Sequence, residues 1–421
     1  MGLAKVSQRT AVKPYSLRNP IWRFLVKQLA AATLGLTLLS IQPAVLAEEE
    51  HPWLLGDWGG KRSALAEKGL DIEAVATVDV LGVVSGGIKQ GVESPANFDL
   101  AVQVDTGKAG WWNNGTLRLY LLGNTGGDTN NLLGALQVAS NIEAPDTVKL
   151  YEAWYEHKFF DDKLSVLAGL HDLNSEFYVT DLSGVFLNSS FGVGQEVAQI
   201  GPSIFPTSGM TVRVKVSPTE RTYVMGAVYD GVPGDPNDPY GTHVDFNDHD
   251  GVLAIGEAGI TGGEGHFFKV AVGGWHQTDF DNMLTGVRGQ NSGMYVVGET
   301  DLWRCEDGRG LGVFGQLGFA DQANNQTDLY AGGGVNWTGP LASRPADVAG
   351  VAFAYARNGD KFLNANPGGF RETETLIEVT YAITPLPWLL VQPDFQYFFN
   401  PGSDRAIEDA AVIGMRVGVT F

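Results

Sequence analysis

The last nine residues, "IGMRVGVTF" (Ile413–Phe421), alternate strictly between two kinds of side chain. One set is apolar and the other is small or polar: Ile413, Met415, Val417, Val419 and Phe421 against Gly414, Arg416, Gly418 and Thr420. Successive side chains of a strand point to opposite faces, so this period of two predicts a β-strand with one apolar face. The final aromatic residue falls on that apolar face.

The same alternation recurs through the rest of the chain. It predicts sixteen strands, at 71–83, 98–106, 115–123, 148–158, 163–171, 208–217, 221–229, 251–261, 266–276, 292–301, 311–320, 328–337, 348–357, 373–383, 388–398 and 411–421. Before these strands, only the stretch "KRSALAEKGL" (61–70) has a helical pattern, and the helix is expected to end at Gly69. The chain is therefore expected to form a single all-β domain.

The connections between these strands alternate in length. The short ones are 107–114, 159–162, 218–220, 262–265 and 384–387. Most of the others are long: 84–97, 124–147, 172–207, 230–250, 277–291, 358–372 and 399–410. Transmembrane barrels have short turns at one end, long loops at the other and an even number of strands. Two connections, 302–310 and 338–347, are longer than tight turns.

The residues opposite the apolar faces are polar or charged. In "GTLRLYLLG" (115–123) three leucines oppose Arg118 and Tyr120, and in "MTVRVKV" (210–216) three valines oppose Arg213 and Lys215. Charged side chains that do not face lipid must face water, and sixteen strands enclose an aqueous channel. We therefore predict one antiparallel transmembrane β-barrel of about 16 strands over residues 71–421. A short helical segment at 48–70 precedes it.

The first 47 residues have the layout of a secretory signal peptide. Six basic residues precede an apolar run from Leu29 to Ile41, and Val45-Leu46-Ala47 forms a small-residue cleavage site. Its removal takes six positive charges and no acid, so the formal charge changes from −20 to −26. Such an acidic chain is not expected to bind nucleic acid. The single cysteine, Cys305, excludes an internal disulfide.

Three stretches resemble the carbohydrate-selective porin (OprB) family of Gram-negative bacteria. They are "GDWGGKRSALAEKGL" (56–70), "YEAWYEHKFFDDKLSVLAGLHDLNSEF" (151–177) and "LPWLLVQPDFQYFFNPG" (386–402), and the resemblance covers residues 52–421. It implies an outer-membrane barrel that passes glucose and related sugars by facilitated diffusion. In sixteen-stranded porins the third external loop folds into the lumen, and here that loop is 172–207.

A weak sugar site needs hydrogen-bonding groups and flat aromatic faces. The start of the third loop offers Asp172, Asn174 and Glu176 as constriction residues; Asp172 and Asn174 could equally form a loop-start turn that bonds its own backbone. The facing wall offers Arg118, Tyr120, Glu152 and Trp154, and the family-like "QPDFQY" stretch offers Gln392, Asp394 and Gln396, with structural wall lining as their alternative. Trp154 is the candidate sugar-stacking platform or, with the register slipped by one, an interfacial aromatic. Arg118 could anchor hydroxyl groups or pair with Glu152.

The sequence also bears on enzymatic activity, bound metals, partners and alternative functions. No G-x-S-x-G motif is present, and we expect no enzymatic activity, cofactor or metal. The acidic stretch "THVDFNDHDG" (242–251) is interpreted as a solvated loop, and a bound divalent cation is the alternative. The expected partners are small sugars, outer-membrane lipid and lipopolysaccharide, the barrel assembly machinery acting through Phe421, and further copies of the chain. A general, weakly cation-favouring porin is the alternative function. The alternative class is a barrel enzyme or a secreted β-rich binding protein.

Overall fold

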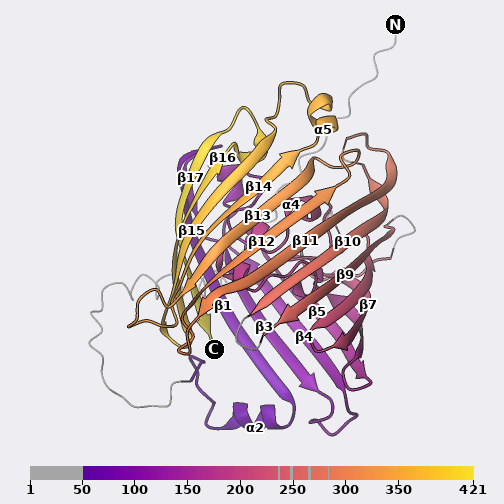
Figure 1. Ribbon diagram of the computed structural model, residues 1–421, viewed down its shortest axis with the longest axis vertical. Helices are drawn as coiled ribbons and strands as arrows, with labels where there is room; N and C mark the ends of the chain where they lie inside the picture. The colour runs from indigo at the N-terminus through magenta and orange to yellow at the C-terminus, as the bar shows by residue number, and fades with distance from the viewer. Residues whose placement is uncertain (1–50, 236–237, 247–249, 264–266, 283) are drawn as a thin grey trace. The chain divides into compact units, whose positions relative to one another are not determined.

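The computed structural model describes residues 51–421 except 236–237, 247–249, 264–266 and 283. In this part of the chain, seventeen strand segments form one antiparallel sheet (Figure 1). The segments β2 (Gly91–Glu93) and β3 (Ala96–Asp105) pair with the same side of β1 (Leu70–Gly87) and are two pieces of one strand. Pro95, which has no N–H to donate, lies at the interruption. The wall therefore has sixteen strands in the described residues.

The remaining strands follow in chain order around the sheet. They are β4 (Gly115–Thr125), β5 (Thr147–Phe159), β6 (Leu164–His171), β7 (Gly209–Thr219), β8 (Thr222–Asp230), β9 (Val252–Gly262), β10 (Phe268–Asp281), β11 (Arg288–Arg304), β12 (Gly310–Ala320), β13 (Thr327–Thr338), β14 (Val348–Asn358), β15 (Thr373–Leu386), β16 (Leu389–Phe399) and β17 (Glu408–Thr420). Each pairs with its sequence neighbours. The predicted all-β barrel and its strand number are confirmed.

The barrel closes where the last strand pairs with the first. The register of β1 and β17 runs from Val75 opposite Thr420 to Gly87 opposite Glu408. A closed sheet leaves no unpaired edge and bonds every wall amide within the wall, as a bilayer requires. Apolar residues face outward, as Val212 at 55% exposure illustrates, whereas the adjacent Arg213 faces inward at 1%. This is the apolar-out, polar-in arrangement of a transmembrane barrel.

The connections alternate between two ends, which we call the loop end and the turn end. One sequence expectation is wrong here: the connection predicted to be long at 277–291 is only 282–287 between strands, because β10 and β11 continue past their apolar segments. The added strand residues include the polar Gln277, Gln290 and Asn291. Apolar alternation marks only the part of a strand that faces lipid, so it underestimates strands that extend beyond it.

Helices are few and short in the described residues. The α-helices are α2 (Lys61–Glu67), α3 (Asn130–Leu133), α4 (Gln195–Ala198) and α5 (Asp360–Ala365), and the 3₁₀ turns are η2 (Leu173–Ser175), η3 (Leu182–Val185), η4 (Ser189–Phe191) and η5 (Pro401–Ser403). The predicted N-terminal helical segment is confirmed as α2, which stops before Gly69 at a φ of 79°. No helix among these residues is long and apolar enough to cross a membrane. The predicted signal peptide lies outside the described residues.

Candidate functional site

The loop between β6 and β7, residues 172–208, folds into the barrel, and we call it the lumen loop. Glu299, on the inner face of β11, accepts hydrogen bonds from the backbone N–H groups of Asp181 (3.0 Å) and Leu182 (2.8 Å). Two charge-assisted bonds to consecutive amides fix both the position and the direction of a segment. The inward-folded long loop predicted from the sequence is confirmed.

Two more wall glutamates hold the lumen loop at other points. Glu378 on β15 accepts from the backbone N–H groups of Leu187 (2.6 Å) and Asn188 (3.0 Å). Glu257 on β9 accepts from the backbone N–H of Tyr178 (3.0 Å). The loop is therefore tied to three strands spread around the wall.

Apolar packing completes the attachment of the lumen loop. Its side chains contribute to two buried clusters with the wall: Phe186, Leu187 and Phe191 with Leu81, Phe314, Leu376 and Phe398, and Phe177, Tyr178, Val193 and Val197 with Tyr229, Leu253, Trp275 and Tyr295. The wall residues in these clusters belong to β1 and to strands from β8 onward. This side of the lumen is a packed interior.

A second loop, residues 126–146, also enters the barrel, and we call it the plug loop. Glu374 on β15 accepts from the backbone N–H groups of Leu136 (2.8 Å) and Gln137 (2.9 Å). The plug loop touches the lumen loop, because the backbone N–H of Asn141 donates to the carbonyl of Leu187 (2.8 Å). Sequence reasoning missed this inward loop, since nothing in its composition separates it from an external one.

The candidates on β16 contact these loops. Gln392 donates to the carbonyl of Val185 (2.6 Å), and Gln396 donates to that of Ala139 (2.8 Å). Asp394 accepts from Gln396 (3.0 Å). All three side chains are at most 5% exposed. The amide groups of Gln392 and Gln396 thus attach the two loops to the wall, and Asp394 supports Gln396.

The candidates at the start of the lumen loop form a local turn. Asp172 accepts from the backbone N–H of Asn174 (2.7 Å) and from the hydroxyl of Tyr151 (2.5 Å). Burial raises the pKa of Asp172 to about 7, although these two hydrogen bonds lower it. Asn174 donates to the carbonyls of Phe177 (3.1 Å) and Gly192 (3.0 Å). This is the self-bonding turn offered as the alternative, and it brings both residues into the loop's own framework.

Glu176 lies in a cluster centred on an arginine of the wall. Arg213 on β7, 1% exposed, donates to both carboxylate oxygens of Glu176, from Nε (2.7 Å) and Nη2 (2.8 Å). Nη2 also donates to Glu156 on β5 (2.9 Å), and Nη1 bonds the hydroxyl of Ser165. The alternation of "MTVRVKV" indicated that Arg213 faces inward, but its partners are far away in sequence, so their identity could not be predicted.

Arg118 and Glu152 form a pair on the adjacent wall. Arg118 Nε donates to Glu152 Oε2 (3.1 Å), which was one of the two alternatives for this arginine. Glu152 Oε1 also accepts from the backbone N–H of Asp172 (3.2 Å). Tyr120 donates its hydroxyl to Asp99 on β3 (2.5 Å) and lies 5.6 Å from the Arg118 guanidinium. These side chains share the inner face of β3, β4 and β5.

Trp154 lies two residues beyond Glu152 on β5. The β4–β5 pairing shifts register between Leu150 and Glu152. From Glu152 onward alternate residues again face inward, and Trp154 is the next of them. The Trp154 ring meets that of His171 edge to face, with centroids 6.0 Å apart. Its indole Nε1 is buried without a hydrogen-bond partner. The side chain itself is partly exposed.

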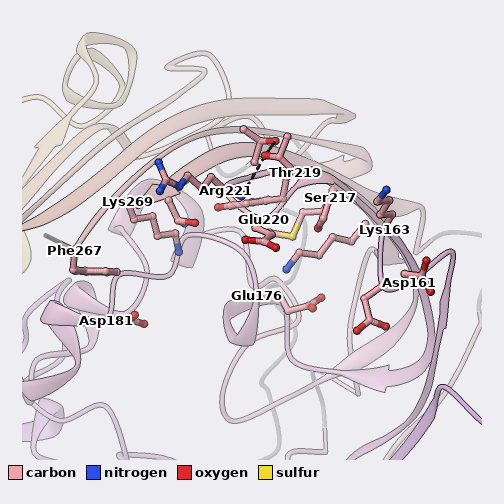
Figure 2. Close-up of a pocket in the computed structure, with 16 residues that line it drawn as sticks. Asp161, Lys163, Glu176, Asp181, Ser217, Thr219, Glu220, Arg221, Phe267 and Lys269 are labelled. Carbon is pink, nitrogen blue, oxygen red and sulfur yellow. Dashed lines mark hydrogen bonds between the residues drawn. The ribbon is translucent and has the colours of Figure 1, made fainter. Parts of the chain in front are cut away.

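An open cavity of about 760 Å³ lies between the lumen loop and the β7–β10 part of the wall. Figure 2 shows Glu176 and Asp181 of the loop on one side of this space, and Lys269 and Ser217 of the wall on the other. Its charged lining is of both signs: Lys163, Lys215, Arg221 and Lys269 with Asp161, Asp162, Glu176, Asp181 and Glu220. Several of these residues belong to connections at the turn end, so the cavity is the chamber between the loop and that opening.

The acidic stretch 242–251 gives no metal centre among the residues described. His243 Nε2 lies 2.7 Å from the carbonyl oxygen of Tyr240 and 3.5 Å from Asp238. Asp248 and His249 fall outside the described residues, and no group of three or more metal-ligating side chains is found in the described part.

Comparisons with known proteins agree with this architecture. The chain is 26% identical to porin B of Pseudomonas aeruginosa over 93% of this chain and 98% of the relative. The high-pH structure of Pseudomonas putida OprB matches with a TM-score of 0.79 and 23% identity, over 89% of this chain and all of that one. The outer membrane channel DcaP of Acinetobacter baumannii shares the fold, with a TM-score of 0.53 and 10% identity over 84% of this chain and 98% of that one.

The family comparison covers most of the barrel. The family described as carbohydrate-selective porin, OprB family, matches residues 89–421. Its members are channel proteins, and the barrel places this chain in the outer membrane of Gram-negative bacteria. The chain belongs to the carbohydrate-selective porin, OprB family.

Proposed function

We propose that this porin passes glucose and related sugars by passive diffusion through a water-filled path along β3–β7. No covalent chemistry is involved. One observation carries the proposal: the arginines facing this path are already neutralised by carboxylates. Arg118 pairs with Glu152, and Arg213 pairs with Glu156 and Glu176. A carboxylate in such a pair still has lone pairs that can accept from hydroxyl groups, and paired charges attract free ions less than unpaired charges do.

The proposed sugar site combines this polar wall with an aromatic face. Arg118, Tyr120, Glu152 and Glu176 offer donors and acceptors, and Trp154 offers the apolar surface for a sugar ring. The chamber beyond, with charges of both signs, suits a neutral solute. Dissociation constants near 1 mM, about −4 kcal/mol, let the sugar leave quickly. In this proposal Asp172, Asn174, Gln392, Asp394 and Gln396 act indirectly, by holding the loops that narrow the path.

A planar bilayer tests the sugar site directly. Single-channel conductance is measured while glucose is titrated into the salt, for the wild type, Trp154→Ala and Trp337→Ala. Trp337 on β13 is 45% exposed and faces outward, so it is a matched control. We expect saturable block at millimolar glucose that weakens several-fold in W154A and not in W337A. Block that is equal in all three proteins would remove Trp154 from the site.

The alternative is a general, weakly cation-favouring porin, which the formal charge of −26 without residues 1–47 favours. The same recordings decide between the two functions. Conductance that does not respond to glucose, together with a cation-selective reversal potential, would establish the general porin. Glucose block would exclude it.

Export and assembly complete the proposal. Residues 1–47 are removed as a signal peptide, the barrel assembly machinery reads Phe421, and lipid and lipopolysaccharide surround the outer face, through which copies of the chain also associate. Mass spectrometry of the mature protein should find Glu48 at the N-terminus. Phe421→Ala should lower the yield of folded barrel in cells. Light scattering in detergent measures how many chains associate, and a monomer would contradict the proposed association of copies of the chain.

A further inference from the structure

The segment before the first strand contains a motif that the channel does not use. "GDWGGKR" (56–62) enters α2, where Asp57 accepts from the backbone N–H (2.8 Å) and the hydroxyl (2.9 Å) of Ser63. Gly59 and Gly60 have φ values of 67° and 85°, a conformation that glycine adopts without strain. These features make a tight turn in front of the helix. The turn brings the motif's tryptophan and arginine together.

Arg62 is enclosed between two indole rings. Its guanidinium carbon lies 4.3 Å from the ring centroid of Trp53 and 4.4 Å from that of Trp58. The side chain is only 6% exposed. Each cation–π contact contributes about 0.5–2 kcal/mol, the larger values applying when the cation is desolvated. Trp58 has a φ of 51°, uncommon for a bulky residue, and the ring contact offsets that strain.

The enclosed arginine holds the end of the last strand. Arg62 Nη2 donates to the backbone oxygen of Phe421 (2.7 Å), across 359 residues of sequence. The same segment makes a second bond, from the backbone N–H of Leu54 to the carbonyl of Thr420 (2.8 Å). The backbone N–H of Phe421 donates to the carbonyl of Ala74 on β1 (2.9 Å). The end of β17 is thus held by β1 and by residues 53–67 together.

We propose that residues 53–67 form a clasp that locks the β1–β17 seam once the barrel has closed. Within the described residues, the seam is the only pairing in this sheet that joins strands from opposite ends of the chain, so its formation closes the wall. The clasp adds contacts that exist only after β17 is in register, and such late contacts slow unfolding. It also occupies the backbone oxygens of Thr420 and Phe421, which excludes any factor that held these oxygens during assembly. The inference does not depend on the sugar function.

Unfolding kinetics test the clasp. The wild type, Arg62→Ala and Arg309→Ala are unfolded in detergent and urea, and the loss of the fast-migrating folded band in gels gives the rate. Arg309 is a matched control, since it pairs with Asp307 (2.7 Å) in the β11–β12 turn away from the seam. We expect R62A to unfold about tenfold faster and R309A to stay within about twofold of the wild type. Equal rates for all three proteins would overturn the clasp.

A double-mutant cycle separates the clasp from general destabilisation. Trp58→Leu and Arg62→Ala should each accelerate unfolding, and the double variant should be little faster than R62A, because R62A already removes the Trp58 contact. Additive effects would overturn the shared contact. Trp53→Ala, which leaves the Trp58 face intact, serves if R62A does not fold, and a wild-type rate for W53A would then overturn the proposal.

Channel recordings and assembly kinetics complete the test. Single-channel conductance and glucose block should be the same in R62A and the wild type, since the clasp lies outside the proposed sugar path. In cells, pulse-labelled R62A should remain associated with the assembly machinery longer than R309A does. Prompt release of R62A would overturn the proposed displacement step, and altered conductance would instead assign Arg62 to the pore.

Discussion

The two halves of the lumen use the same residue types for different purposes. On the side from β8 to β17, inward glutamates accept backbone N–H groups of the folded loops: Glu257, Glu299, Glu374 and Glu378. On the side from β4 to β7, inward glutamates pair with arginine side chains: Glu152 with Arg118, and Glu156 with Arg213. Glu152 also accepts one loop amide, the backbone N–H of Asp172. The first half is a packed interior and the second borders the proposed path. An inward carboxylate in a barrel strand is therefore not by itself a pore-lining residue.

The contrast has a physical reason. A loop folded into a barrel brings backbone amides that have lost water, and wall carboxylates satisfy them. Where the wall meets fewer loop amides, its carboxylates need other partners, and the arginines Arg118 and Arg213 supply them. Substitutions on the two sides should therefore differ in both size and kind.

The largest effect is expected on the packed side. Glu378→Ala removes the acceptor for two consecutive loop amides, and the free energy of unfolding should fall by about 4 kcal/mol. The released loop should also raise the noise of the open-channel current. Thermal unfolding followed by gel mobility measures the first effect, with Glu306→Ala, an exposed turn glutamate, as control. A loss below about 1 kcal/mol would show that Glu378 adds little to the attachment of the loop.

The next effect is expected on the open side. Arg213→Ala leaves Glu156 and Glu176 unpaired, which should destabilise the protein by about 3 kcal/mol and make the pore more cation-selective. Reversal potentials in a salt gradient measure the selectivity. Arg213→Lys keeps the charge and should restore selectivity but only part of the stability, because lysine cannot bond both oxygens of Glu176. Unchanged selectivity in R213A would place this cluster away from the ion path.

The pH dependence of stability offers a third comparison, within the lumen loop. Burial raises the pKa of Glu196 to about 7, although a hydrogen bond from Tyr178 (2.9 Å) lowers it. The folded state then holds this proton more tightly than the unfolded state. Stability should be greatest below the ordinary carboxyl pKa and should fall by about 3 kcal/mol as pH rises through 7.

Glu196→Gln tests this pH dependence. The amide mimics the protonated acid, so the variant should lose most of the decline between pH 5 and 8, while the decline due to Asp172 remains. Urea unfolding across this pH range makes the measurement. A variant with the wild-type profile would show that Glu196 is not the titrating group.

The smallest effect concerns the partly exposed pair of the open side. The side chain of Arg118 is 24% exposed, so Arg118→Ala should cost only about 1 kcal/mol of stability. Its effect on glucose block should exceed that of Arg309→Ala, since Arg309 lies in the β11–β12 turn away from the proposed path. Equal block in the two variants would limit Arg118 to wall structure.

Much of this architecture was accessible from sequence because it depends on local periodicity. The alternation around Arg118 and Arg213 assigned both residues to the inner face, and the strand count followed from repeating that reading. The role of Gln392 and Gln396 was not accessible from sequence, because an amide side chain can bond a loop carbonyl as well as a sugar hydroxyl. The turn formed by Asp172 and Asn174 was one of two local readings, and the structure adds the Tyr151 contact.

The sequence by itself determined the barrel, because a strand's period of two and its turn signals are set by neighbours in the chain. It also identified 172–207 as the longest connection, and the resemblance to porins marked this third loop as the one that enters the lumen. Only the tertiary structure decided that the plug loop enters as well, that Arg213 joins Glu156 to Glu176, and that Arg62 reaches Phe421. Each of these contacts joins residues that are distant in the chain, and their pairing depends on how the closed wall positions them.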